Sequence, residues 1–221
     1  MSRSSGGGEL TYPQHGLTRS LASEEGAGSG GSGGSAISRD TDWPEGYRRV
    51  HHRIQVAHGA QAYGRLARGI LDWGIQRGAG LRVAALPSLR HQGTDADASA
   101  DADGAVRIGS RVACGFGLGP IRLPIPCEVV WLEKPTAVVV LPDGRTRPQR
   151  AGFGYGTLPG HPASGEEAFM ASLHADGSVY FELLAFSKPA GLIFRLGSPV
   201  TTFAQSFATQ RYLQAAKELA R

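Results

Sequence analysis

Apolar and polar residues alternate at period two over much of this chain, which is typical of strands that bury one face. The segments with this pattern are Arg48–Ala57, Leu81–Leu86, Val106–Leu118, Ile121–Glu133, Gln149–Leu158, Glu166–His174 and Val179–Phe186. The turn residues Ala175–Ser178 join the last two segments and predict a hairpin. The valine-rich stretch Thr136–Leu141 is placed as an extension between strands.

Two stretches have helical spacing instead. The first starts at His58 and Gly59 and runs to about Gln76, and its apolar face holds Tyr63, Leu66, Ala67, Ile70 and Trp73. The second opens with Ser198 as a cap and Pro199 at the first helical position, and it runs to the C-terminus. Its apolar stripe is read as Val200, Phe203, Ala204 and Phe207, continued by Tyr212, Leu213, Ala216 and Leu219. This helix is therefore expected to be a core element, with Phe203 and Phe207 buried.

The order of elements is one strand, one helix, about six strands and a long C-terminal helix. An antiparallel sheet of this length must cover one face, and a long amphipathic helix is its natural cover. The sequence therefore predicts an α+β fold, in which an antiparallel sheet of about 6–7 strands wraps the C-terminal helix. This order resembles the helix-grip architecture of START and Bet v 1-like domains, which implies an apolar cavity between sheet and helix.

The Gly/Ser run at residues 26–35 has the composition of a flexible linker. We expect residues 1–38 to be a flexible N-terminal segment and residues 39–221 to be a single domain. The two flanks of the linker, Leu10–Thr18 and Asp42–Tyr47, contain aromatic and turn residues, so both are expected to dock on the domain.

The charge pattern argues against a nucleic-acid partner. The net charge is +4, but the arginines are scattered and form no basic run with interleaved aromatic residues. An Asp-rich loop at residues 91–105 lacks the Gly and terminal Glu of an EF-hand, so it is read as a solvated acidic loop. Cys114 and Cys127 have no metal-ligand spacing, so no metal is expected. They are read as buried thiols, with a disulfide between neighbouring strands as the alternative.

The chain has no apolar run of about 18 residues and no secretory signal, so we expect a soluble, cytoplasmic protein without a transmembrane segment. No cofactor is expected, because the Gly-x-Gly-x-Gly runs at Gly115 and Gly152 do not lead into helices. Nothing in the sequence specifies an oligomeric state.

The strand around Tyr155 is the most informative segment for function. Phe153, Tyr155 and Thr157 alternate with glycines and must share one face of the sheet. The glycines leave the other face bare, so that another segment can lie close against it. If the aromatic face is the inner one, its hydroxyls need hydrogen-bond partners or a ligand. A filled core, with each hydroxyl bonded to backbone, is the alternative.

A short loop follows this strand and carries the candidate chemistry. His161 lies a few residues before Glu166 and Glu167, and a His–carboxylate pair is the start of a general acid–base device. A turn histidine beside a Glu pair is the alternative interpretation. The weak catalytic candidates are His161, Glu167 and Tyr155. The candidate ligand-binding residues are Trp73, Phe153, Tyr155, Thr157, His161 and Ser187. Ser187 is read as a strand-end cap rather than a nucleophile, because the Gly-x-Ser-x-Gly elbow is missing.

Motifs spread over most of the chain resemble one known family. They are Tyr12-Pro with Gly16-Leu-Thr18, Pro44–Tyr47, the helix around Trp73, Phe153–Pro162, Gly165–Phe169, Ala185–Pro189 and Arg211–Leu213. Together they are similar to the domain-of-unknown-function 1990 family, also called uncharacterised protein family 0548. The Gly/Ser and Asp-rich loops look like additions to its usual length. The family carries no settled activity, so the resemblance implies a single-domain boundary and not a mechanism.

Three classes of function follow from these observations. The first is a module that binds a small apolar or amphipathic ligand between the sheet and the C-terminal helix, and such a ligand is then the expected partner. The second is an enzyme that uses His161, Glu167 and Tyr155 for acid–base chemistry. The third is a structural or membrane-associated β-rich component. The two amphipathic helices fit a soluble core better than this third class.

Overall fold

The computed structural model describes residues 9–26, 43–86, 104–118, 121–137, 139–140, 146–190 and 198–221. The helices are α1 (Leu17–Gly26), α2 (Ala60–Leu71), α3 (Gly74–Gly78) and α5 (Ser198–Ala220). The strands are β1 (Arg48–His58), β2 (Arg82–Ala85), β3 (Arg111–Leu118), β4 (Ile121–Glu133), β5 (Val139–Val140), β6 (Thr146–Arg147), β7 (Gln149–Thr157), β8 (Ala163–Leu173) and β9 (Ser178–Pro189).

Seven strands form one antiparallel sheet in the order β1-β9-β8-β7-β4-β3-β2. The chain enters at one edge with β1 and reaches the opposite edge, β2, by way of α2 and α3. It then returns strand by strand until β9 pairs with β1. The short strands β5 and β6 form a separate two-stranded sheet among the described strands. The expected turn joins β8 to β9, where Gly177 takes a positive φ and its N–H donates to the carbonyl of His174.

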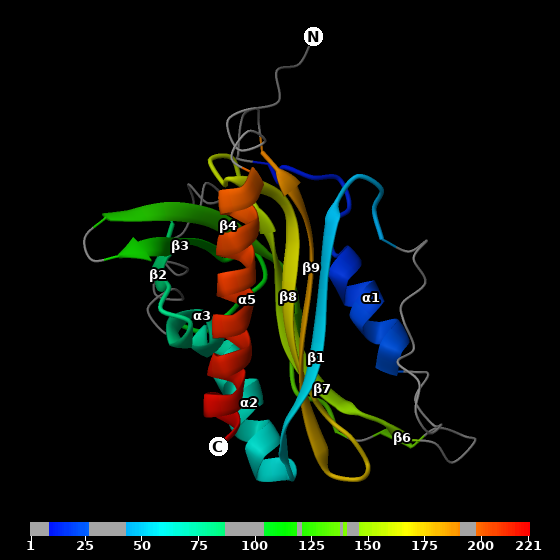
Figure 1. The fold of residues 1–221 in the computed structure, drawn as a ribbon. Coiled ribbons are helices and arrows are strands. Elements are labelled where there is room, and N and C mark those ends of the chain that lie inside the picture. The colour runs from blue at the N-terminus through cyan, green and yellow to red at the C-terminus, as the bar shows by residue number, and fades with distance from the viewer. Residues whose placement is uncertain are drawn as a thin grey trace, which may run out of the picture.

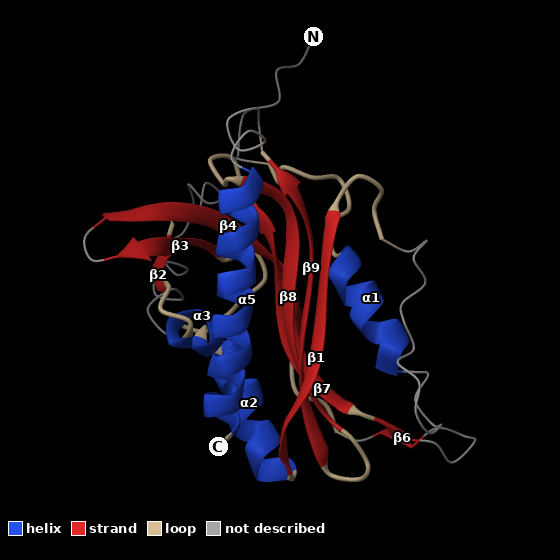
Figure 2. Ribbon diagram, in the orientation of Figure 1, coloured by secondary structure: helices blue, strands red, loops and turns tan. Residues whose placement is uncertain are grey.

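The curved sheet holds α5, α2 and α3 on one side, here called the inner face (Figures 1 and 2). Its core contains large side chains with no exposed surface, such as Leu66, Ile70, Phe153, Phe169 and Phe181. Burying a side chain of this size contributes roughly 1.5–3 kcal/mol each. The fold is thus α+β, with a seven-stranded antiparallel sheet around a long C-terminal helix, as the residue pattern predicts.

A second apolar cluster covers the opposite, outer face of the sheet. Here α1 lies across the strands (Figure 1), and Leu21 and Tyr12 pack with Trp131, Phe186 and Trp43. The expected docking of the Leu10–Thr18 flank therefore agrees with the structure. Residues 9–26 are not part of a free extension, which differs from the flexible segment expected for residues 1–38. Residues 9–26 are held in place because they bury apolar surface against the sheet. Most of the Gly/Ser run lies outside the described residues.

The first predicted helix is interrupted near its end. α2 stops at Leu71, Trp73 takes a left-handed conformation with φ 57° and ψ 19°, and α3 then begins at Gly74. Among the described residues, Trp73 is the only non-glycine with a positive φ. Such a conformation costs a residue with a Cβ roughly 1–2 kcal/mol, so the surrounding packing must impose it.

The C-terminal helix forms as predicted, but part of its expected buried stripe is wrong. Phe207 is 48% exposed, whereas Tyr212 is 5% exposed. Five residues correspond to a rotation of about 140° around a helix, so the two rings cannot share one face. The buried face of the described part follows Thr209, Tyr212, Ala216 and Ala220. The side chain of Phe203 lies outside the described residues, as does most of the Asp-rich loop at 91–105.

Candidate functional site

The inner face carries a carboxyl group in apolar surroundings. Tyr155 on β7 and Glu167 on β8 are paired in register. Both point to the inner side, because they alternate with residues of the outer face. The Tyr155 hydroxyl donates a hydrogen bond of 2.5 Å to Oε2 of Glu167. The structure therefore brings together two of the three weak catalytic candidates.

The environment of this pair shifts its proton affinities. Burial raises the pKa of Glu167 from 4.5 to about 7, against the opposing effect of the Tyr155 hydrogen bond. Burial, followed by the Glu167 charge, also raises the pKa of Tyr155 and of Tyr212 on α5 well above the ordinary value. At neutral pH Glu167 is thus poised between its neutral and charged forms, while both tyrosines keep their protons.

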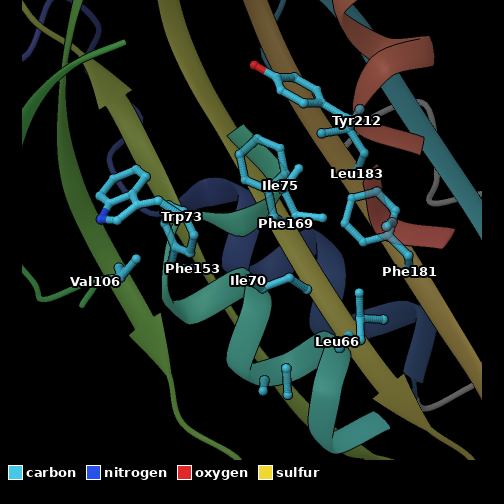
Figure 3. Packing of buried hydrophobic residues seen from close by; sticks show 14 of the residues in the cluster. Leu66, Ile70, Trp73, Ile75, Val106, Phe153, Phe169, Phe181, Leu183 and Tyr212 are labelled. Atoms are coloured by element: carbon cyan, nitrogen blue, oxygen red, sulfur yellow. The ribbon is translucent and has the colours of Figure 1, made fainter. Parts of the chain in front are cut away.

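Aromatic rings fill the inner face next to the pair (Figure 3). The Trp73 ring lies edge-on to Phe153 at 5.0 Å between centroids and is stacked on Tyr155 at 6.3 Å. Phe169 lies 5.6 Å from Tyr155, and Tyr212 meets Phe169 edge-on at 5.1 Å. Trp73 and Phe153, two of the expected ligand-binding residues, are thus packed in the core.

Glu167 keeps some exposed surface, although its strand neighbours Ala168 and Phe169 have none. Ser187 lies on β9, two residues after Ala185, which pairs with Glu167. Ser187 is half-buried and faces the inner side by alternation. The inner face thus becomes accessible and polar toward this end of the sheet.

His161 lies apart from the carboxylates. The ring Nδ1 of His161 accepts a 2.9 Å hydrogen bond from the N–H of Ala163, and its backbone N–H donates to the carbonyl of Leu158. Burial lowers the pKa of His161 to about 4, so the ring is neutral at neutral pH. These contacts stabilise the turn between β7 and β8, and the structure does not bring His161 into contact with Glu167.

Thr157 belongs to a different contact. Its Oγ1 is bonded to Oγ1 of Thr11 at 2.5 Å and accepts the N–H of Gly165 at 3.0 Å. The Thr11 N–H also donates to the Thr157 carbonyl at 3.0 Å. Thr157 therefore joins the N-terminal segment to the end of the sheet.

Glu166 has a structural role that the sequence analysis missed. It is 2% exposed on the outer face, where Oε2 accepts the Tyr12 hydroxyl at 2.6 Å and the Gly16 N–H at 2.7 Å. Oε1 accepts the N–H of Thr18 at 3.0 Å and the Thr18 hydroxyl. The carboxylate therefore binds the first turn of α1, where the helix dipole also favours a negative charge. The signal available in the sequence was the adjacency of two glutamates on a strand, which requires them to face opposite sides.

The glycines of β7 leave room for this arrangement, as predicted. A Cβ on Gly154 would overlap the Trp131 indole, and one on Gly156 would overlap the Tyr12 hydroxyl. Trp131 in turn donates its indole N–H to Thr18 Oγ1 at 2.9 Å. The bare face of the strand is thus where the N-terminal segment lies.

The two cysteines are free and buried on neighbouring strands. Cys114 on β3 is paired with Ile125, whereas Cys127 on β4 is paired with Val112, so they lie diagonally to each other. Burial raises the pKa of Cys114 to about 12. The interpretation as buried thiols agrees with the structure, and the disulfide alternative does not.

Solved structures with a similar fold are remote in sequence. A hypothetical protein from Helicobacter pylori is 10% identical over 79% of this chain and 88% of that one, with a TM-score of 0.48. Norcoclaurine synthase from Thalictrum flavum is 11% identical over 78% of this chain and 86% of that one, with a TM-score of 0.40. The major latex-like protein 151 from Panax ginseng is 7% identical over 79% and 98%, with a TM-score of 0.39.

Relatives in sequence match shorter stretches. A UPF0548 protein from Deinococcus radiodurans is 45% identical over 65 residues, which are 29% of this chain and 33% of that protein. The UPF0548 protein At2g17695 from Arabidopsis thaliana is 38% identical over 78 residues, 34% of this chain and 38% of that protein. The chain thus matches about a third of the length of these relatives. The family described as "Domain of unknown function (DUF1990)" matches residues 32–215, and the chain belongs to this family.

Proposed function

We propose that the protein binds a small apolar or amphipathic ligand on the inner face of the sheet, beside α5, with Tyr155 and Glu167 as the polar end of the site. The observation that carries the proposal is Glu167 itself. It is a carboxyl group among aromatic rings, its pKa is raised to about 7, and a tyrosine hydroxyl is the only hydrogen-bond partner described for it. Burying such a group without further partners is costly, so a ligand that donates a hydrogen bond would stabilise it.

The chemistry of the site constrains the ligand. A charged carboxylate only accepts hydrogen bonds, so the polar end of the ligand should be a hydroxyl, amide or amine group. The rest should be apolar, because the neighbouring side chains are aromatic. Ser187 lies on the neighbouring strand at this end of the site, and Tyr212 on α5 is hydrogen-bonded to Tyr155.

Native mass spectrometry of the purified full chain should detect a co-purifying small molecule. A neutral fluorescent probe, Nile red, should bind saturably and compete with that molecule. Tyr155→Phe and Glu167→Gln should each weaken binding about 2- to 10-fold, as expected for a lost hydrogen bond of roughly 0.5–1.5 kcal/mol. Glu218→Gln, at an exposed position on α5, is the matched control and should change nothing. If no ligand or probe binds, and both inner-face variants only alter stability, the pair is a core contact and the proposal fails.

A second candidate function is acid–base catalysis by Glu167, because a group with a pKa near 7 exchanges protons efficiently at neutral pH. In that case Glu167→Gln should abolish turnover of the co-purified compound or its analogues while leaving ligand affinity within a few fold. Equal turnover in Glu167→Gln and the native chain would exclude this role.

Among the residues that the structure describes, no helix is long and apolar enough to cross a membrane.

A further inference from the structure

The outer face of the sheet becomes polar where α1 ends. A shallow hollow that opens to solvent lies there, and its enclosed part of about 10 Å³ has room for one water-sized atom, such as a single oxygen. Side chains from β1, β9, β8 and β7 reach it, since Arg53 is paired with Glu182 and Arg150 with Ser172. The residues that line it are Ala22, Arg53, Pro148, Arg150, Ser172, His174 and Glu182.

Arg150 brings an unpaired charged donor to the hollow. It is 9% exposed, and its Nη1 donates a 2.7 Å hydrogen bond to the carbonyl of Ala22 near the end of α1. Its Nη2 is buried and has no hydrogen-bond partner among the residues that the structure describes. A buried guanidinium nitrogen without an acceptor is costly, so an acceptor atom in the hollow would be strongly favoured.

Arg53 lies on the other side of the hollow and is held in place. Its guanidinium stacks on the Tyr180 ring, 4.0 Å from the centroid, and Nη2 is 2.8 Å from Nε2 of His174. No other hydrogen bond of the Arg53 guanidinium is made to the described part of the chain. The Ser172 hydroxyl lies 3.4 Å from the same His174 nitrogen. Two guanidinium groups and a hydroxyl therefore converge on one small space, which suits an oxyanion.

Glu182 narrows the choice of oxyanion. It is 7% exposed, and its Oε1 lies 2.9 Å from Nε2 of His51. A carboxylate repels a fully ionised anion, but it accepts a hydrogen bond from an anion that still carries a hydroxyl proton. Hydrogen phosphate and singly ionised phosphate esters carry that proton at neutral or mildly acidic pH, whereas sulfate does not.

We propose that this hollow is a binding site for a phosphate group that keeps one proton. One ionised oxygen enters the hollow and binds Nη2 of Arg150, while the rest of the phosphate lies at its open mouth, where Arg53 binds a second oxygen and Glu182 accepts the P–OH. The site is on the opposite side of the sheet from the ligand site proposed above, so each stands or fails independently of the other.

Calorimetric titration of the full chain with sodium phosphate, with sodium sulfate at equal ionic strength, tests the proposal. Phosphate should bind saturably, and sulfate at least tenfold more weakly. Arg53→Gln should weaken phosphate binding at least tenfold without unfolding the chain, because Arg53 is exposed. Arg82→Gln, an exposed arginine on the other edge strand, is the matched control and should have no effect.

A Glu182→Gln variant that melts like the native chain should lose the preference for phosphate over sulfate. The proposal is overturned if phosphate does not bind saturably, or if Arg53→Gln and Arg82→Gln affect it equally. The hollow then holds only water, or the protein attracts anions through its overall charge.

The phosphate group could belong to a soluble ester or to a lipid headgroup, and two further titrations distinguish these sources. Flotation with phosphatidic acid vesicles, but not with phosphatidylcholine vesicles, that is lost in Arg53→Gln would assign a lipid headgroup. Arg53-dependent binding of glycerol 3-phosphate without flotation would assign a soluble ester.

Discussion

Glu166 and Glu167 are neighbours in sequence, and their carboxylates lie on opposite faces of one strand. Glu166 accepts hydrogen bonds from the Tyr12 hydroxyl, the Gly16 N–H and both donors of Thr18. Glu167 accepts one, from Tyr155. The first carboxylate is surrounded by protein donors, whereas the second has one donor, and its burial raises the pKa of Glu167 to about 7.

Glu167 should make the stability of the protein depend on pH. Its folded pKa of about 7 lies above its ordinary value of 4.5, so the folded chain holds this proton more tightly than the unfolded chain. The contribution is fully present below about pH 4.5 and is lost as pH rises through about 7. At about 1.36 kcal/mol per pKa unit, the loss is at most about 3 kcal/mol.

Urea unfolding of the native chain and of Glu167→Gln at pH 4.5, 6 and 8 measures this contribution, since other titrating groups cancel in the difference. The native chain should lose stability relative to the variant as pH rises. A difference that stays constant with pH would contradict a raised pKa in the folded state.

Replacing Glu166 should loosen the N-terminal segment. Glu166→Ala leaves buried donors of Tyr12 and Thr18 without an acceptor, and hydrogen bonds to a charged group contribute roughly 1.5–3 kcal/mol each. We expect the free energy of unfolding to fall by about 3 kcal/mol or more, measured by urea denaturation. Glu9→Gln, at an exposed position of the same segment, should change it by less than about 0.5 kcal/mol. Equal effects of the two changes would show that Glu166 does not hold the segment.

At the scale of single elements, α5 is fixed by its C-terminal half. Tyr212 meets Phe169 edge-on, and Ala216 and Ala220 are buried beside it, whereas Phe207 lies on the other side of the helix with Arg211 near its ring. Tyr212→Ala should lower the free energy of unfolding by roughly 3–5 kcal/mol. Phe207→Ala should change it by less than about 0.5 kcal/mol, since its ring is half exposed. Denaturant midpoints for the two variants give the comparison, and a larger effect at Phe207 would mean that α5 packs with a different face.

Most of the elements could be predicted from the residue pattern, because period-two alternation and helical spacing are local properties. β4 begins and ends where the alternation does, and β7 ends within one residue of the prediction. The errors concern contacts between distant segments. Nothing near Trp73 signals its left-handed conformation, since packing against β7 imposes it. The helix carries apolar residues on more than one side, so its sequence also permits a buried stripe through Phe207. Packing against the sheet determines which side of the helix is buried.

The same limit applies to the candidate site. Alternation placed Phe153 and Tyr155 together and predicted that the glycines face another segment. It could not tell which of Glu166 and Glu167 faces the core, because two adjacent carboxylates give no apolar signal. His161 was grouped with them by proximity in sequence, but a turn holds it where its ring bonds to local backbone.

At the scale of the whole molecule, the sheet separates two apolar clusters, and the outer one includes a segment that precedes the Gly/Ser run. The Gly/Ser composition of residues 26–35 predicts that limited proteolysis of the full chain cuts there first. The cleaved N-terminal fragment should stay bound, because Tyr12 and Leu21 are buried and Arg150 bonds to the Ala22 carbonyl.

Native mass spectrometry after cleavage should therefore show both fragments in one complex. The same cut in Glu166→Ala should release the smaller fragment. A first cut within residues 150–190 would contradict the single domain expected at residues 39–221.

Because both native thiols are buried, α1 on the outer face can be labelled selectively at an introduced cysteine. Cys114 and Cys127 are 2% and 1% exposed and keep their protons at neutral pH, so neither should react with a maleimide in the folded protein. A cysteine introduced at Ser20, which is exposed on α1, would then be labelled selectively with a dye. Because the sheet lies between that dye and the inner face, its emission would report the attachment of α1 while leaving Tyr155 and Glu167 untouched.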